Sequence, residues 1–275
     1  LSTFFITLSA ENGYDLWLRY PKVDNAKLAK EYLGVNKNIL FPANTEVLQA
    51  AKKELAMGLE GMLNIELNEQ SKFSGKSLVI GTPESNEHIA GMSQANELKQ
   101  LDDEGYVIRT VTHNRKTVNV IAAKKDIGVL YGVYHYLRLM QTAQSLNNLA
   151  IKEEPKLQIR ILNHWDNLNG TIERGYAGYT IWEWQRLPGY VTKRYTDYAR
   201  ANASIGINGT VLNNVNANAN SLRTSYIIKA AAIADALRPY GVKVYLTARF
   251  SAPREIGGLK TADPIDPEVR QWWKD

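Results

Sequence analysis

The chain has 275 residues, 44% of them apolar and 22% charged, which is the composition of a folded globular protein with a substantial core. It contains no cysteine, so disulfides and cysteine-bound metals are excluded within this sequence, and its longest apolar runs are shorter than a membrane span. The net charge is +5, without any block of five like charges. We therefore expect no nucleic-acid-binding tail, and the basic excess suits either an acidic ligand or an ordinary mixed-charge surface.

The first ten residues allow two interpretations. Phe4, Phe5 and Ile6 begin a short apolar patch that ends in the small residues Ser9 and Ala10. This pattern resembles the end of a secretory signal, in which case the mature chain begins near residue 11 and is exported to a periplasm or to the outside. The same residues also suit a first β-strand, in which case a cytoplasmic protein is expected.

Residues 11–150 mix strands with amphipathic helices. Apolar residues alternate along residues 15–20, which predicts a strand, and recur at three- and four-residue spacing along residues 45–63, which predicts a helix. Residues 77–81 form a short apolar strand that ends at a glycine, and residues 84–92 suit a short helix.

A hairpin is predicted next, at residues 105–112 and 117–122, and Asp126 is the predicted N-cap of a helix whose apolar residues share one face. The composition changes at residues 152–155, the predicted linker. The first domain is therefore expected to be an α+β or α/β sandwich at residues 11–150.

Strands and helices alternate strictly after the linker. The expected strands lie at residues 157–162, 210–212 and 242–246, and the expected helices near residues 192–203, 222–237 and from 266 onward. Polar residues follow each strand, which is the pattern of a parallel β/α fold.

Residues 159–275 make fewer than half of the roughly 250 residues that a complete (β/α)8 barrel needs. The predicted fold class is thus α/β, with the sandwich domain followed at residues 156–275 by an incomplete TIM (β/α)8 barrel of about three of eight units. An open doubly wound sheet is the alternative, but no glycine-rich phosphate loop follows any strand.

The predicted sugar site lies at the carboxyl ends of these strands, where (β/α)8 enzymes carry their functional groups. His164, Trp165, Asp166 and Asn167 follow the first strand. An indole stacks on the apolar face of a pyranose, and short polar side chains bind its hydroxyls. Trp165 can instead plug the barrel mouth. Asp166 and Asn167 can cap the next turn, and His164 can be a hydrogen-bonded structural residue.

The second and third strand ends add the candidates Asn213, Val215 and Arg249. Arg249 can hold a ligand carboxylate in a bidentate contact, or it can hold an acid of the barrel itself. Val215, an apolar residue among asparagines, can line a small pocket or belong to the core.

No convincing acid–base pair or metal site is present. Asp166, Glu173 and Glu183 share a single loop, whereas the two carboxylates of a glycosidase usually come from different strand ends. The four histidines lack metal-ligand spacing, and no HExxH, GxSxG or P-loop motif occurs. We therefore predict no catalytic residue, metal or cofactor for this stretch.

Several long segments resemble the family 67 α-glucuronidases. The most specific are RILNHWDNLNGTIERGYAGYTIW at residues 160–182 and NGTVLNNVNA at residues 208–217, and TARFSAP at residues 247–253 also fits. ENGYDLWLRY at residues 11–20 and IGVLYGVYHYLRL at residues 127–139 extend the likeness over nearly the whole chain.

The resemblance implies an inverting hydrolase that removes glucuronic acid, usually 4-O-methylated, from xylo-oligosaccharides without a metal or organic cofactor. Trp165 matches the family's stacking tryptophan, and Val215 matches the apolar residue near the methyl ether. The family's general acid lies beyond the third strand and its base carboxylates later still, so this stretch alone is expected to be inactive.

The resemblance implies that the binding partner is a xylo-oligosaccharide that carries glucuronic acid. We expect no nucleic-acid partner, and the resemblance allows the whole protein to form a homodimer. Two rival interpretations stay open. One is a different carbohydrate-active (β/α)8 hydrolase that shares the leading domain, and the other is a non-catalytic carbohydrate-binding module.

Overall fold

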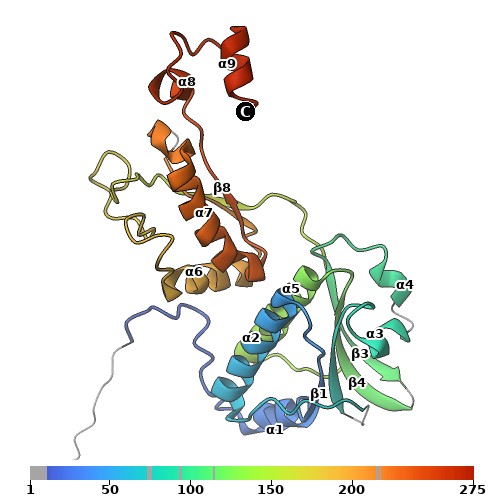
Figure 1. Ribbon diagram of the computed structural model, residues 1–275. Helices are drawn as coiled ribbons and strands as arrows, with labels where there is room; N and C mark the ends of the chain where they lie inside the picture. The colour runs from blue at the N-terminus through green and yellow to red at the C-terminus, as the bar shows by residue number, and fades with distance from the viewer. Residues whose placement is uncertain (1–10, 73–75, 93–94, 114, 215, 217) are drawn as a thin grey trace, which may run out of the picture.

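The computed structural model describes residues 11–72, 76–92, 95–113, 115–214, 216 and 218–275. Two α/β parts follow each other along the chain (Figure 1), and they share an apolar core. Both interpretations of residues 1–10, and the predicted role of Val215, concern positions outside the described residues. Within the described residues, no helix has the length and apolar character needed to cross a membrane.

The N-terminal part is built on a five-stranded mixed sheet with the strand order β1-β2-β4-β3-β5. Strands β1, β2 and β4 run parallel, and β3 lies antiparallel to both β4 and β5. All five residues of β2 are buried, as expected for a central strand that is covered on both faces. The strands are β1 (Asn38–Leu40), β2 (Ser77–Gly81), β3 (Tyr106–His113), β4 (Lys116–Ala123) and β5 (Ala150–Glu153).

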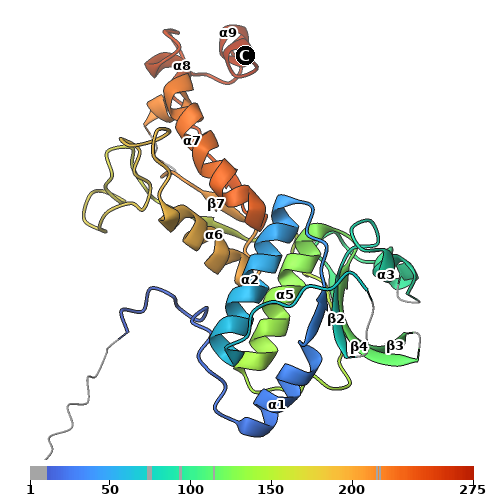
Figure 2. The same ribbon diagram turned by 60° about the horizontal axis from the view of Figure 1, so that its bottom comes forward.

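Helices cover both faces of this sheet (Figure 2). The long helices α2 and α5 pack on one face beside α1, and the short helices α3 and α4 close the other. The close approach of α5 to the sheet depends on Gly128, where a Cβ would lie 2.4 Å from the carbonyl oxygen of Gly105. The helices are α1 (Ala26–Val35), α2 (Glu46–Leu63), α3 (Glu87–Ala90), α4 (Ala95–Leu98) and α5 (Asp126–Gln141).

The second part alternates strands and helices, as the sequence predicts. Its three strands form a parallel sheet in the order β6-β7-β8, and the sheet does not close into a barrel. The strands are β6 (Ile161–Asn163), β7 (Gly209–Val211) and β8 (Lys243–Tyr245). The α-helices are α6 (Lys193–Ser204), α7 (Thr224–Leu237), α8 (Ala252–Glu255) and α9 (Pro267–Trp272), with 3₁₀ turns η1 (Ala219–Leu222) and η2 (Arg238–Tyr240). The predicted α/β class is therefore confirmed.

Three local predictions are wrong or shifted. Residues 14–17 form a turn and residues 18–20 have no regular structure, so the predicted strand at residues 15–20 is absent; Leu16 and Tyr20 adopt positive φ values of 51° and 49°, outside the β region. The predicted linker at residues 152–155 starts later, since β5 extends to Glu153 and pairs with β3. Asp126 is the first residue of α5 rather than its N-cap, and its carboxylate accepts a 2.7 Å hydrogen bond from the Thr45 hydroxyl at the start of α2.

A buried ion pair joins the two parts. Glu54 of α2 is 1% exposed, and the Arg200 guanidinium of α6 contacts both of its carboxylate oxygens at 2.6 and 2.8 Å. The hydroxyls of Tyr20 and Tyr134 donate to the same carboxylate. Burial raises the pKa of Tyr20, so this phenol remains a proton donor. The charges are thus fully partnered, which fixes how α6 and its sheet sit on the N-terminal part.

Candidate functional site

Hydrogen bonds beyond the strands bring the three strand ends to one edge of the small sheet. The His164 N–H donates to the Val211 carbonyl at 3.1 Å, and the Leu212 N–H donates to the Tyr245 carbonyl at 3.0 Å. Across the next turn, the Asn214 N–H donates to the Asp166 carbonyl at 2.9 Å. The loops after β6 and β7 therefore lie side by side, as expected for parallel strands.

The side chain of Trp165 faces solvent. It is 41% exposed and lies two residues after the end of β6. Its carbonyl accepts a 2.8 Å hydrogen bond from the Glu173 N–H, which folds the following loop back against its own start. The indole thus sits on a backbone held in place while its ring stays accessible for stacking.

Asp166 and Asn167 hold the loop together. Asp166 is 2% exposed, and its carboxylate accepts a hydrogen bond from the Thr180 hydroxyl. The Asn167 amide donates to the Thr171 hydroxyl at 3.0 Å and to the Glu173 carbonyl at 2.8 Å. In this structure both side chains cap the turns of the loop, which is one of the two roles expected from the sequence.

His164 lies in an aromatic cluster beneath the loop. Its Nε2 is 2.8 Å from the Tyr198 hydroxyl, which in turn is 2.9 Å from the Thr210 hydroxyl of β7. The fully buried Trp182 packs edge-on against the imidazole, with 5.5 Å between ring centroids. Burial lowers the pKa of His164, and the Asp166 carboxylate, 3.8 Å from Nδ1, opposes this effect in part.

Sequence reasoning missed Tyr198 and Trp182 as partners of His164. The available signal was the pair Tyr195 and Tyr198 on α6, because residues three apart share one helix face. Tyr195 also packs against Trp182, with ring centroids 5.4 Å apart. The cluster packs against the strand ends and holds His164 in place.

Asn213 joins the second strand end to the third. The side chain is 1% exposed, its amide donates to the Thr247 carbonyl at 3.0 Å, and its oxygen accepts from the Thr247 N–H at 2.7 Å. This reciprocal pair continues the parallel pairing of β7 and β8 beyond their ends. Asn213 is therefore saturated by backbone groups in this structure.

Arg249 is exposed and engaged by its own loop. Its Nε lies 2.8 Å from a Glu255 carboxylate oxygen and 2.9 Å from the Ser251 hydroxyl. This contact is one of the two roles that the sequence allows for Arg249, the other being a contact with a ligand carboxylate. An exposed pair of this kind exchanges readily for a ligand carboxylate because it gains little free energy in water.

The remaining loop carboxylates do not face each other. Glu183 pairs with Arg186 at 2.7 Å, and Glu173 adopts a positive φ of 58° at the tip of the folded loop. Among the described residues, no group of three or more His, Asp or Glu side chains is placed to hold a metal ion.

Comparison with known proteins identifies the family. Residues 16–136 match "Glycosyl hydrolase family 67 N-terminus", and residues 139–275 match "Glycosyl hydrolase family 67 middle domain". A probable alpha-glucuronidase A from Aspergillus clavatus is 34% identical over 96% of this chain and 31% of its own length. A probable alpha-glucuronidase A from Aspergillus niger is 33% identical over the whole chain and 32% of its own length.

A solved structure of a family GH115 4-O-methyl-alpha-glucuronidase shares the fold, with a TM-score of 0.56 and 13% identity over 86% of this chain and 33% of that one. The chain spans about a third of the length of the relatives that it matches. Because the two family matches together span almost every residue from 16 to 275, the chain belongs to glycoside hydrolase family 67.

Proposed function

We propose that this chain forms one wall of the sugar pocket of an α-glucuronidase that releases glucuronic acid or its 4-O-methyl ether from xylo-oligosaccharides with inversion. Membership of family 67 and the alpha-glucuronidase names of its relatives support this proposal. The net charge of +5 is compatible with an acidic substrate, as it is with an ordinary mixed-charge surface.

The observation that carries the proposal is the contrast between Trp165 and its neighbours. Its indole is 41% exposed, while Asp166 on one side is 2% exposed and His164 on the other is held by Tyr198. An accessible ring on a fixed base is what stacking on a pyranose requires, since the ring must be rigid before the sugar arrives. We assign the stacking role to Trp165 and a supporting role to the groups around it.

The general acid and base, on this proposal, come from outside these residues. Glycosidic hydrolysis needs two carboxyl groups on opposite sides of the bond. Asp166 is buried against Thr180, and Glu183 is occupied by Arg186. We propose that the chain supplies substrate contacts only, with Arg249 able to exchange Glu255 for the uronate carboxylate.

The test is hydrolysis of short aldouronic acids by the whole protein and its Trp165→Ala variant. Loss of the stacked ring is expected to lower kcat/KM by about 10- to 100-fold, in keeping with the value of a buried aromatic contact. Trp165→Phe should recover part of that loss. Leu33→Ala on α1 is the control, because Leu33 is equally exposed at 41% but lies in the other part.

A substrate panel separates this proposal from its rival. If the whole protein released neutral hexoses or hexosamines and no uronic acid, the glucuronidase assignment would be wrong. If Trp165→Ala matched the control variant on aldouronic acids, the assignment of the stacking residue would be wrong while the activity stood.

A further inference from the structure

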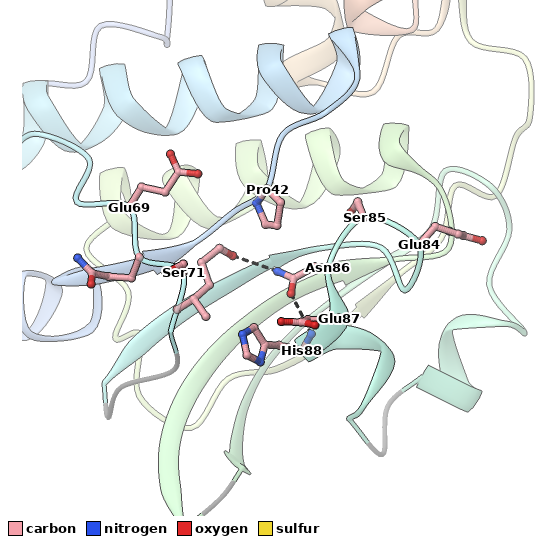
Figure 3. A pocket seen from close by; sticks show the side chains of 10 residues that line it. Pro42, Glu69, Ser71, Glu84, Ser85, Asn86, Glu87 and His88 are labelled. Atoms are coloured by element: carbon pink, nitrogen blue, oxygen red, sulfur yellow. Dashed lines mark hydrogen bonds between the residues drawn. The ribbon is translucent and has the colours of Figure 1, made fainter.

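A hollow lies in the N-terminal part, lined by residues of β1, α3 and neighbouring loops rather than by the strand ends of the small sheet. It has a volume of about 780 Å³, within the range of pockets that hold small molecules. Figure 3 shows Glu69 and Ser71 on one side, Glu87 and His88 on the other, and Pro42 at its end beside β1.

Both walls are fixed to the same edge strand. On one side, the Ile39 N–H of β1 donates to the Asn68 carbonyl at 3.0 Å, and the Gln70 N–H donates to the Ile39 carbonyl at 2.8 Å. On the other side, the buried Asn86 amide donates to the carbonyls of Leu40 at 3.2 Å and Ile80 at 2.9 Å. The hollow is therefore preformed rather than dependent on loop closure.

The start of α3 is also fixed by hydrogen bonds of Asn86. The Asn86 side-chain oxygen accepts the His88 N–H at 3.0 Å, which caps the helix and orients Glu87 beside the hollow (Figure 3). Each polar group of the Asn86 side chain is thereby used internally. Asn86 therefore shapes the wall, and a ligand would contact the other side chains that line the hollow.

The lining combines apolar surface with hydrogen-bond acceptors and a negative charge. Leu40 and Pro42 supply the apolar part, and the carboxylates belong to Glu69, Glu84 and Glu87. No Lys or Arg is among the described residues that line the hollow, although Lys52 pairs with Glu69 from outside. Carboxylates accept hydrogen bonds from sugar hydroxyls, but they repel an acidic sugar.

We propose that this hollow is a second carbohydrate site, which binds a short neutral stretch of a pyranose chain and rejects uronic acids. The choice of xylose units rests on the proposed function of the whole protein. The site would hold an undecorated part of the xylan backbone while the strand-end pocket takes the acidic side group. Because the hollow prefers neutral sugars and the strand-end pocket prefers an acidic one, the two sites would bind different parts of the same polysaccharide.

The experiment is calorimetric titration of the protein with xylotriose, repeated for Glu87→Ala, Glu87→Gln and Glu60→Ala. Saturable binding is expected, weakened about tenfold by Glu87→Ala because a charge-assisted hydrogen bond to a hydroxyl is lost. Glu87→Gln keeps an acceptor and should weaken binding less. Glu60 is exposed on α2 away from the hollow, so Glu60→Ala should leave the affinity unchanged.

Glucuronic acid provides the second arm. Its binding should be unaffected by Glu87→Ala, because the acidic hollow does not accept it, and hydrolysis of short aldouronic acids should be equal in the variant and the wild type. Absence of xylotriose binding, or xylotriose binding that Glu87→Ala leaves unchanged, would overturn the second site. A wild-type protein that releases no glucuronic acid would instead overturn the proposed function and leave the titration result standing.

Discussion

Helices cover both faces of the N-terminal sheet, whereas the three short strands of the second part keep apolar side chains in solvent. Every residue of β2 is buried, but Leu162 of β6 is 39% exposed and Tyr245 of β8 is 38% exposed. In a complete (β/α)8 barrel the strand residues of both faces are packed. The sheet of the N-terminal part is thus covered by its own helices, and the small sheet of the second part depends more on the shared core, the Glu54–Arg200 pair and hydrogen bonds at its strand ends.

Among the predictions, breaking the buried Glu54–Arg200 pair that joins the two parts should lower the stability most. In Arg200→Met the Glu54 carboxylate stays buried without its cation, which is expected to lower the free energy of unfolding by about 3–5 kcal/mol. Arg238→Met is the control, since the Arg238–Asp235 pair is 65% exposed on both sides and should contribute little. Urea denaturation measures both. Equal losses would show that the buried pair is not what joins the two parts.

The cores of the two parts can be compared with one kind of substitution. Leu55 of α2 is fully buried, so Leu55→Ala should cost about 3 kcal/mol through lost burial and the cavity left behind. Leu162→Ala removes a side chain that is 39% exposed and should cost less than about 1 kcal/mol. If urea denaturation gave similar losses, the open face of the small sheet would be covered in solution.

Removing the hydrogen bonds at the strand ends is expected to have the next largest effect on stability. Asn213→Ala leaves the N–H and carbonyl of Thr247 without their partners, which is expected to cost about 1–3 kcal/mol. Asn213→Asp keeps the acceptor for the Thr247 N–H, but it places a buried carboxylate oxygen against the Thr247 carbonyl, so its loss at pH 7 should be larger. Thermal unfolding ranks the two variants. A neutral Asn213→Ala would mean that β7 and β8 are held by their backbone pairing alone.

The smallest effect concerns the titration of His164. Because burial lowers its pKa in the folded protein, the folded state binds the proton less readily than the unfolded chain does. The stabilisation is therefore complete above the ordinary histidine pKa of about 6.5 and is lost as the pH falls below it. We expect wild type to lose stability relative to His164→Gln between pH 7 and pH 5, measured by urea denaturation. A constant difference would mean that the imidazole is not desolvated.

Periodic segments were the easiest to predict. Helix α2 appears where apolar residues recur every three or four positions, with Thr45 as its cap, and α9 begins after Asp266 at an N1 proline as expected. Residues 15–20 show why pattern alone can fail. Leu18 and Tyr20 are both buried, but Leu16 is 47% exposed, and the backbone turns at residues 14–17 and has no regular structure at residues 18–20. An alternating pattern reports burial and does not distinguish a strand from an irregular segment packed on a core.

In the candidate site, too, the sequence indicated the positions of residues, whereas their roles depended on the tertiary structure. Trp165, His164 and Asn213 were found from their positions after predicted strands, because functional groups gather at such ends. Their roles differ by surroundings: one side chain is exposed, and the other two are held by Tyr198 and Thr247. Those partners lie 34 residues away in the sequence in each case, beyond the reach of any local pattern.

Residue spacing by itself determined the alternation of strands and helices, the α/β class and the segment that carries the candidate sugar contacts. These features depend on residues that are close together in the sequence, so a local pattern is enough to predict them. Only the tertiary structure decided which polar residues are saturated internally, how Glu54 and Arg200 join the two parts, and where the acidic hollow lies beside β1. Burial and pairing depend on segments far apart in the sequence, and folding alone brings them together.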